Sequence, residues 1–223
     1  MYPITKNIAS YFSVGWKEQY AGLLVNEHWR AFIERFNEYL KAASTEVRLP
    51  YFCEEVTPPL TQIMSYFKSQ YEIVIEQDNH SERAWATVLQ NAPFAYLLIV
   101  LGQRLTSASV LDETAIPPLK QALLDSCFET YNGKICVVTR AWEKHVGRST
   151  DNFWGEIRGN PSEKDLYVKN LVLDLIDNKT WWNLFCHYKH EFVYEIRVGS
   201  GHGIRWNKAG TSVIGFLEPF MNE

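Results

Sequence analysis

The hydrophobic positions of this chain follow a helical period over most of its length. In the stretch NEHWRAFIERFNEYLKAA, which starts at Asn26, large apolar side chains recur at the three- and four-residue spacing of one helix face. The same spacing recurs after three proline-containing breaks and along three later stretches, at 60–71, 94–102, 119–130, 134–146, 162–175 and 180–190. The pattern predicts a mainly helical, bundle-like domain of about seven to nine helices.

The period changes from helical to alternating after His190. Apolar and polar residues alternate over 192–198, the glycine-rich sequence GSGHG follows, and a β-branched run covers 211–217. This pattern predicts three short strands in an antiparallel β-meander. The expected fold class is therefore α+β, mainly α, with a helical part over about 1–190 and the meander over about 191–219.

One segment allows two interpretations. Asn132-Gly133 is either a turn between helices or a hairpin turn ahead of a strand. We favour a helix over 134–146 because Ile135, Val138 and Trp142 fall on one helical face, and a strand there stays open. Composition suggests a boundary only at the loop over 147–162, so we expect a single domain over 1–223.

Composition and charge narrow the classes of function. Of the 223 residues, 46% are hydrophobic and 14% aromatic, and most large rings of a helical domain fill its core. The formal net charge of −4 argues against binding to nucleic acid through bulk electrostatics, which needs a basic surface, and equally against an anionic membrane surface. The longest apolar run, over 92–102, is shorter than the roughly 20 residues that cross a bilayer, so no membrane contact is expected.

Cysteine usage indicates the compartment and the metal chemistry. Four cysteines lie far apart and form no CxxC pair, which is typical of reduced thiols in an intracellular protein. No secretory signal is apparent at the N-terminus, so we expect a soluble cytoplasmic protein, with a nuclear location left open. Cys186 and His190 are four residues apart, but a structural zinc site needs four ligands. We expect no metal and no cofactor.

The tail RVGSGHGIRW, over 197–206, is the most unusual stretch and the first candidate site. Its glycines let a ligand approach the backbone, and His202 and Arg205 could donate hydrogen bonds to a phosphate or carboxylate. A small anionic ligand would thus bind His202, Arg205, Arg197 and Glu218. The alternative is that a twisted hairpin needs glycine here while Arg197 and Arg205 pair with Glu195 and Glu218.

A second candidate is an interaction surface built on aromatic side chains. Phe153 and Trp154 lie in a polar, glycine-bearing loop, and Trp182 stands next to Trp181, where two neighbours on a helix cannot face the same core. Trp is over-represented among the side chains that dominate protein–protein binding. The alternative is that Phe153 and Trp154 fill the core beneath the loop.

These observations order three hypotheses about function. The chain lacks the common signatures of hydrolases, proteases and kinases. We therefore favour a non-catalytic intracellular protein-interaction or scaffold domain with a protein partner. The alternative is an enzyme or a binder of small anionic ligands, with its site in the glycine-rich loop over 199–206. A protein that associates with nucleic acid is the weakest of the three.

Overall fold

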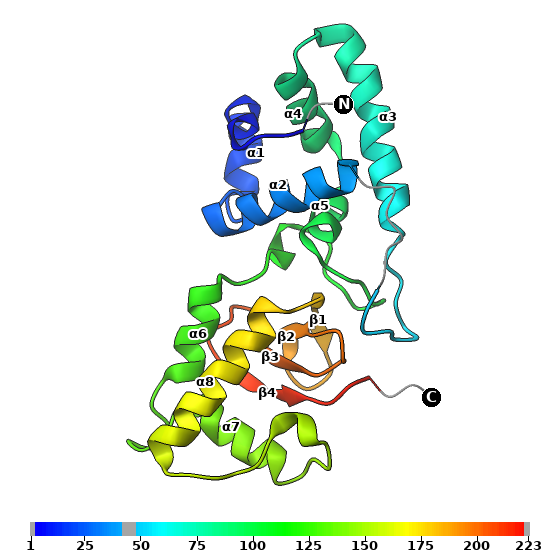
Figure 1. The fold of residues 1–223 in the computed structure, drawn as a ribbon. Helices are drawn as coiled ribbons and strands as arrows, with labels where there is room; N and C mark the ends of the chain where they lie inside the picture. Colours follow the sequence, from blue (N-terminus) through cyan, green and yellow to red (C-terminus); the bar gives the residue numbers. More distant parts are fainter. Residues whose placement is uncertain (1–2, 42–47, 221–223) are drawn as a thin grey trace. The chain divides into compact units, whose positions relative to one another are not determined.

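The computed structural model describes residues 3–41 and 48–220. Within these residues lie eight α-helices, three short 3₁₀ helices and one four-stranded antiparallel sheet (Figure 1). The predicted fold class, a mainly helical α+β fold that ends in an antiparallel meander, is confirmed.

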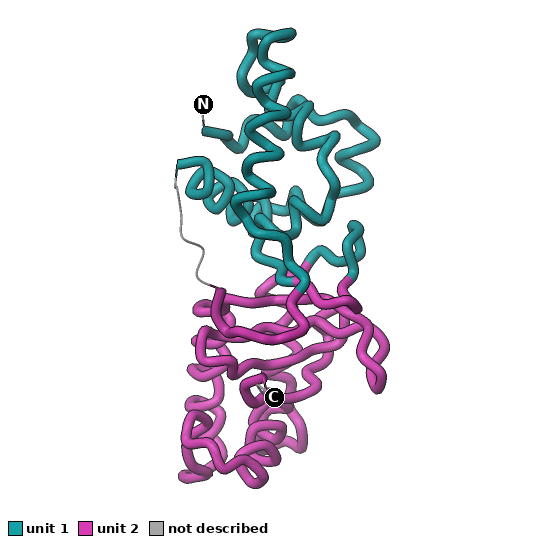
Figure 2. Tube along the Cα trace, turned by 90° about the vertical axis from the view of Figure 1, so that its right-hand side faces the viewer, with its two compact units in different colours: residues 1–47, 56–104, 110–116 teal, residues 48–55, 105–109, 117–223 magenta. Residues whose placement is uncertain are grey.

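The chain divides into two compact units (Figure 2). Unit 1 comprises residues 1–47, 56–104 and 110–116, and unit 2 comprises residues 48–55, 105–109 and 117–223. The expectation of a single domain over 1–223 stays a prediction.

Unit 1 is built from helices alone. Its elements are η1 (Lys6–Tyr11), α1 (Val14–Gln19), α2 (Asn26–Lys41), α3 (Leu60–Asp78), α4 (Ser81–Asn91), α5 (Phe94–Leu101) and η2 (Glu113–Ala115). The predicted apolar stripe of α2 faces the core, where Phe36 meets Phe67 and Trp85 edge to face at centroid distances of 5.2 and 5.3 Å. The core of this unit is therefore packed with aromatic side chains.

The helices of the described residues differ from membrane-spanning helices in length or composition. None of them alone has both the length and the apolar character to span a bilayer. The bent pair of α4 and α5 meets the criterion only when its two helices are taken together.

Unit 2 contains the sheet and the helices that cover one of its faces. Its elements are α6 (Lys120–Phe128), α7 (Val137–Val146), η3 (Asn152–Trp154), α8 (Pro161–Asp177), β1 (Trp181–His187), β2 (Glu191–Arg197), β3 (Gly203–Asn207) and β4 (Val213–Leu217). The strands pair in the order β1-β2-β3-β4, each antiparallel to the next. Helices α6 and α7 contact β4, and α8 contacts β2 and β3.

The two faces of the sheet differ in chemistry. The face that carries Tyr194, Ile196 and Trp206 is apolar and buried, as expected of a face that packs on helices. The opposite face carries Asn183, Glu195 and Arg205 side by side, because the register pairs Asn183 with Glu195 and Glu195 with Arg205. Buried charge is therefore concentrated on one face.

Strand β1 corrects a prediction. We expected a helix from about 180 to 190, but residues Trp181–His187 form the first strand, so the meander has four strands and begins ten residues earlier than predicted. The first four residues of β1 are all buried. A strand that is buried on both faces lacks the alternating pattern, and this run of apolar residues fitted a helical spacing equally well.

The segment around Asn132-Gly133 combines both interpretations. Helix α7 occupies Val137–Val146, as favoured, while an isolated antiparallel bridge joins Thr130 to Cys136 across the turn. Gly133 has a φ of 75°, which suits such a turn. The turn carries the Tyr131 side chain to the start of α7.

Two glycines of the hairpin between β2 and β3, Gly201 and Gly203, leave no room for a side chain. Gly201 has a φ of 94°, and a Cβ on Gly203 would lie 2.1 Å from the carbonyl oxygen of Ile196 in the paired strand. Glycine at position 203 is therefore required for β2 and β3 to approach each other.

We predict that Gly203→Ala destabilises unit 2 by at least about 1–3 kcal/mol, because the new methyl group meets backbone that cannot move without breaking the strand pair. Urea unfolding measures the change. Gly199→Ala in the same hairpin is the matched control, since its Cβ would meet only Leu49 at an ordinary contact distance of 3.7 Å. Equal stability of the two variants would contradict the prediction.

Candidate functional site

The structure separates the four predicted ligand-binding residues into two clusters within unit 2. His202 and Glu218 lie together beside the loop that follows α7, whereas Arg197 and Arg205 bind Glu195 on the polar face of the sheet. His145 binds Glu218 and belongs to the first cluster, which we call the His145 pocket. We call the second cluster the Glu195 network.

His202 is anchored from every side. Its Nδ1 lies 2.9 Å from the Ser200 hydroxyl and its Nε2 lies 2.7 Å from a carboxylate oxygen of Asp151. The ring stacks on Phe153 with a centroid distance of 3.8 Å, and only 6% of the residue is exposed. His202 thus fixes the position of the Asp151 carboxylate.

His145 is oriented by a carboxylate. It projects from the last turn of α7, and its Nε2 lies 3.0 Å from Oε1 of Glu218, the residue after β4. Glu218 also accepts a hydrogen bond from the indole nitrogen of Trp154 at 3.2 Å, so the carboxylate is itself fixed. Among the described residues nothing bonds the second ring nitrogen, Nδ1. An imidazole fixed at one nitrogen by a carboxylate and open at the other is the arrangement of a general base.

The surroundings set the protonation states of this pocket. Burial lowers the pKa of His145, and the Arg148 charge adds to that shift while Glu218 opposes it. Burial raises the pKa of Glu218, but hydrogen bonds from Ser149 and Trp154 outweigh it, so the net shift is downward. The backbone N–H of Phe153 and then His202 lower the pKa of Asp151. At neutral pH the pocket therefore presents a neutral His145 beside two ionised carboxylates.

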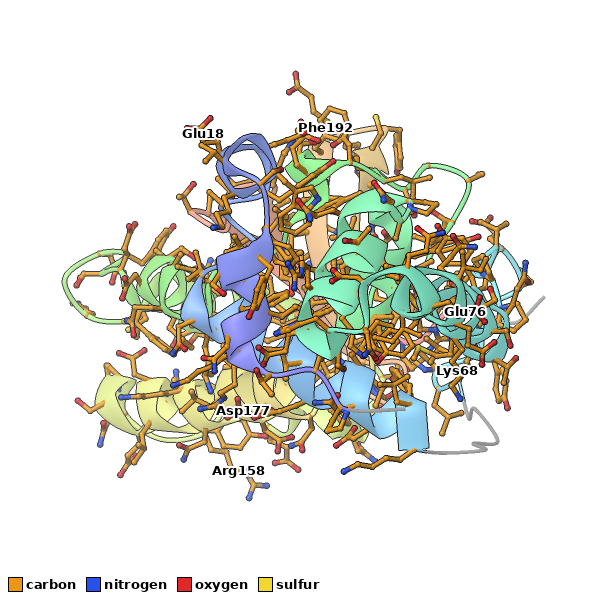
Figure 3. The ribbon with its side chains drawn as sticks, turned by 90° about the horizontal axis from the view of Figure 1, so that it is seen from above. Glu18, Lys68, Glu76, Arg158, Asp177 and Phe192 are labelled. Carbon is orange, nitrogen blue, oxygen red and sulfur yellow. The ribbon has the colours of Figure 1, made fainter. Side chains whose placement is uncertain are left out.

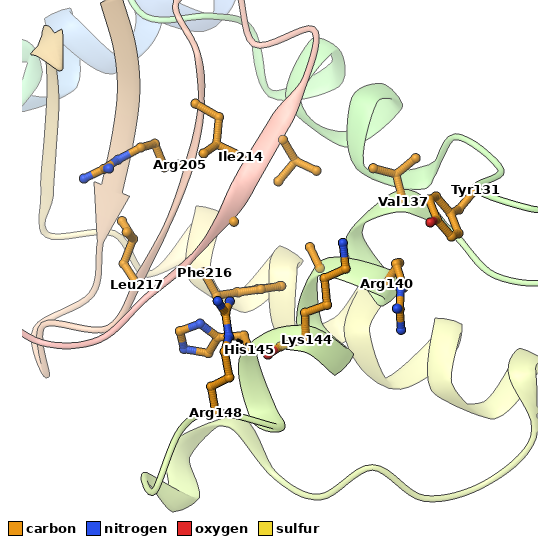
Figure 4. Close-up of a pocket in the computed structure, with 13 residues that line it drawn as sticks. Tyr131, Val137, Arg140, Lys144, His145, Arg148, Arg205, Ile214, Phe216 and Leu217 are labelled. Carbon is orange, nitrogen blue, oxygen red and sulfur yellow. Dashed lines mark hydrogen bonds between the residues drawn. The ribbon is translucent and has the colours of Figure 1, made fainter. Parts of the chain in front are cut away.

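Two adjoining cavities meet at His145. An open pocket of about 560 Å³ is lined by His145, Arg148, Ser149, Thr150, Asp151 and Glu218. A groove of about 330 Å³ runs from it between α7 and β4, and we call this the α7–β4 groove (Figure 4). Arg148 lines both, and its side chain bonds only the carbonyl of Lys144, with no carboxylate partner in the described part of the chain. Its charge is available to an anion.

Three side chains of this pocket have the spacing of a cation site. Ligand atoms of Asp151, His202 and Glu218 lie within 4.8 Å of one another. In the present geometry, however, His202 Nε2 donates its hydrogen to the Asp151 carboxylate at 2.7 Å, so this nitrogen has no lone pair to offer a cation. We do not assign a cation to them.

The Glu195 network is a buried ion cluster. One carboxylate oxygen of Glu195 accepts from Arg197 Nε at 2.6 Å, and the other accepts two hydrogen bonds from Arg205, one of them at 2.8 Å. Arg205 also donates to Nε2 of His187 at 3.0 Å. Glu195 is 1% exposed, and this pairing with Glu195 matches the alternative interpretation of the arginines.

Arg197 also connects the network to the His145 pocket. Its Nη1 donates to the backbone carbonyls of Gly201 and Glu218 at 2.6 and 2.7 Å, and its guanidinium lies 3.8 Å from the centre of the Phe220 ring. Burial lowers the pKa of Arg197, against the effect of Glu195. This side chain thus joins the hairpin that carries His202 to the residue that orients His145.

The three predicted interaction residues are not exposed anchors. Trp154 is fully buried and Trp182 is 3% exposed, on the helix-covered side of β1. Phe153 is half-buried against His202. The alternative interpretation of Phe153 and Trp154, as side chains that fill space beneath their loop, agrees with these positions.

Comparison with known protein families found a match that lies within unit 2. The family model described as the CdiA C-terminal tRNase toxin domain matches residues 124–218, less than half of the chain, from α6 to the residue after β4. No curated protein and no solved structure matches the chain.

This match corrects two predictions. The expected non-catalytic interaction or scaffold domain is contradicted, because the matched family is one of tRNase toxins. The expectation that nucleic acid is disfavoured as a partner is wrong for the same reason. The net charge averages over the whole chain and therefore does not reveal a local group of cations. Arg140, Lys144 and Arg148 line the same groove.

We predict that Glu195→Gln lowers the free energy of unfolding by about 3–5 kcal/mol, because it leaves two buried guanidinium groups without their countercharge. Urea unfolding measures the loss. Glu191→Gln on the same strand is the matched control, since that residue is exposed. A loss below about 1 kcal/mol, the value typical of surface ion pairs, would show that the network is not a structural element.

Proposed function

We propose that unit 2 is a ribonuclease that cleaves tRNA, with its catalytic centre in the His145 pocket. The single observation that carries the proposal is the His145–Glu218 pair, which lines an open pocket together with Arg148. The family match supports the substrate and the toxic role, since it covers both members of this pair.

The pocket offers the groups that RNA cleavage by internal transfer needs. His145 accepts the proton of a ribose 2′-hydroxyl through Nδ1, and Glu218 stabilises the imidazolium that forms. The 2′-oxygen then attacks phosphorus, the bond to the 5′-oxygen breaks, and that oxygen takes a proton from water. The products are a 2′,3′-cyclic phosphate and a 5′-hydroxyl.

Arg148 supplies the charge that such a reaction requires. The attacked phosphate gains negative charge in the transition state, and a guanidinium without a carboxylate partner can bind two of its oxygens at once. Asp151 lines the same pocket but is anchored to His202, so we assign it to positioning.

A second centre of similar composition lies in the Glu195 network. There an imidazole, His187, stands 3.0 Å from Arg205, which binds Glu195, and Arg197 lies on the other side of the same carboxylate. Burial and then the Arg205 charge lower the pKa of His187. Both oxygens of Glu195 are occupied, and for this reason we rank the network second.

We predict that His145→Gln reduces the rate of tRNA cleavage by about 10²–10⁴-fold, the usual contribution of a general base. Cleavage of end-labelled tRNA by the purified chain, with and without EDTA, measures the effect and identifies the 2′,3′-cyclic phosphate. His80→Asn is the control, because His80 caps α4 in unit 1 and Asn is an equally good N-cap.

The same assay separates the two centres. Loss of cleavage in His187→Gln together with full activity in His145→Gln would move the reaction to the Glu195 network. Absence of cleavage of any RNA by the folded wild-type chain would refute the nuclease proposal itself. Complete loss in EDTA would show that the reaction needs a cation.

We predict that the imidazole of His145 titrates below 6.5 and that its two charged neighbours move it in opposite directions. The pKa should rise in Arg148→Gln, which removes a repelling cation, and fall further in Glu218→Gln. NMR titration of the ring proton measures both. Because the folded pKa is the lower one, unit 2 should lose stability as the pH falls from above 6.5 to that value. A pKa above 6.5 would contradict the assignment of a neutral base.

A further inference from the structure

The α7–β4 groove has features that catalysis at His145 does not use. It begins at the His145 pocket and extends along the wall formed by α7, with Val213–Leu217 of β4 opposite, and Tyr131 stands at its far end (Figure 4). We infer that this groove binds an unpaired stretch of RNA beside the cleaved phosphate, so that the enzyme cuts single-stranded regions of its substrate. This inference rests on the proposed function.

The charges along the groove fit the backbone of one strand. Arg140 and Lys144 are four residues apart on α7, which places these groups about 6 Å apart along the helix, close to one nucleotide step, and Arg148 follows two residues after the helix ends. Lys144 is exposed, and its ammonium group has no hydrogen-bond or ion-pair partner among residues 3–41 and 48–220. Arg140 contacts only Glu143, at 3.4 Å, and Glu143 is also bound by Lys164 at 2.9 Å.

The far end of the groove offers a surface for a base. The Tyr131 ring is 52% exposed and makes no ring contact within the described part of the chain. Its position is set by the bridge between Thr130 and Cys136 and by a hydrogen bond of its own N–H to the carbonyl of Ile135 at 2.9 Å. Stacking on such a ring is available to an unpaired base, whereas paired bases are already stacked in the duplex.

The size of the groove decides between one strand and two. Its volume of about 330 Å³ is at the lower end of the range for sites that enclose small ligands, about 300–1,000 Å³. One or two nucleotides fill such a space, and a double helix cannot enter it. Opposite the cations of α7 the groove is lined by Val213, Ile214 and Phe216 of β4, which offer contacts to the faces of sugar and base, and by Arg205, which is bound to Glu195.

Binding of two fluorescent RNAs to the full chain tests the inference. The probes are a hairpin with an unpaired loop and a perfect duplex of the same composition, and the measurements use the His145→Gln background so that no RNA is cut. We expect the hairpin to bind at least about tenfold more tightly than the duplex. The double variant Arg140→Ala/Lys144→Ala should lose about tenfold or more of that affinity, since each charged contact contributes about that factor.

Salt dependence gives a second readout of the same variant. Each phosphate contact to a single strand contributes about 0.7 to the slope of log affinity against log salt, so losing two should reduce the slope by about 1.4. Tyr131→Ala should weaken binding without changing the slope, because a ring carries no charge. The charge-matched control is Arg158→Ala/Lys169→Ala, which removes two exposed cations outside the groove, one of them the outward-pointing Arg158 (Figure 3).

Every outcome is informative. Equal affinity for hairpin and duplex, or equal losses in the groove and control variants, would overturn the inference, as would cleavage of the wild-type substrate within paired stems. If no RNA is cleaved but the hairpin still binds through the groove, the proposed function fails, while binding of unpaired RNA in the groove stands. No binding of either RNA overturns the inference as well.

Discussion

The candidate site depends on the hydrogen bonds made by the Arg197 guanidinium. One guanidinium bonds the Glu195 carboxylate, the carbonyl of Gly201 and the carbonyl of Glu218. It therefore joins the hairpin that carries His202 to the end of β4, and those two segments hold the carboxylates around His145. The energetic cost of burying an arginine is offset because several acceptors share it, and geometric precision in the pocket is the result.

Local patterns in the sequence identified most helices and the last three strands of the meander, and they failed at the first strand. The stripe of α2 was recognisable because that helix has one exposed and one buried side. Strand β2 was recognisable because polar and apolar residues alternate along it, although both of its faces are buried over residues 193–197. The first four residues of strand β1 are buried on both faces of the sheet. Their sequence therefore lacks the alternation that distinguishes a strand from a helix. The extra strand could be found only from the partner that pairs with it.

The sequence predicted His202 and Glu218 as site residues but not His145. GSGHG drew attention to His202, and Glu218 was included with it, because glycine and histidine in a short loop are unusual. His145 was not among the predicted site residues, and 73 residues separate it from Glu218, its partner. No spacing rule covers such a distance. A histidine on an apolar helical stripe was the one available signal, and it is shared by many structural histidines.

The pocket assembles from three separate stretches of chain, the end of α7 with its following loop, the β2–β3 hairpin and the residue after β4. None of these stretches carries both His145 and Glu218, which are 73 residues apart in the sequence and meet only in the folded unit. The proposed ribonuclease activity would therefore exist only in the folded unit, because an unfolded chain does not hold the imidazole against its carboxylate.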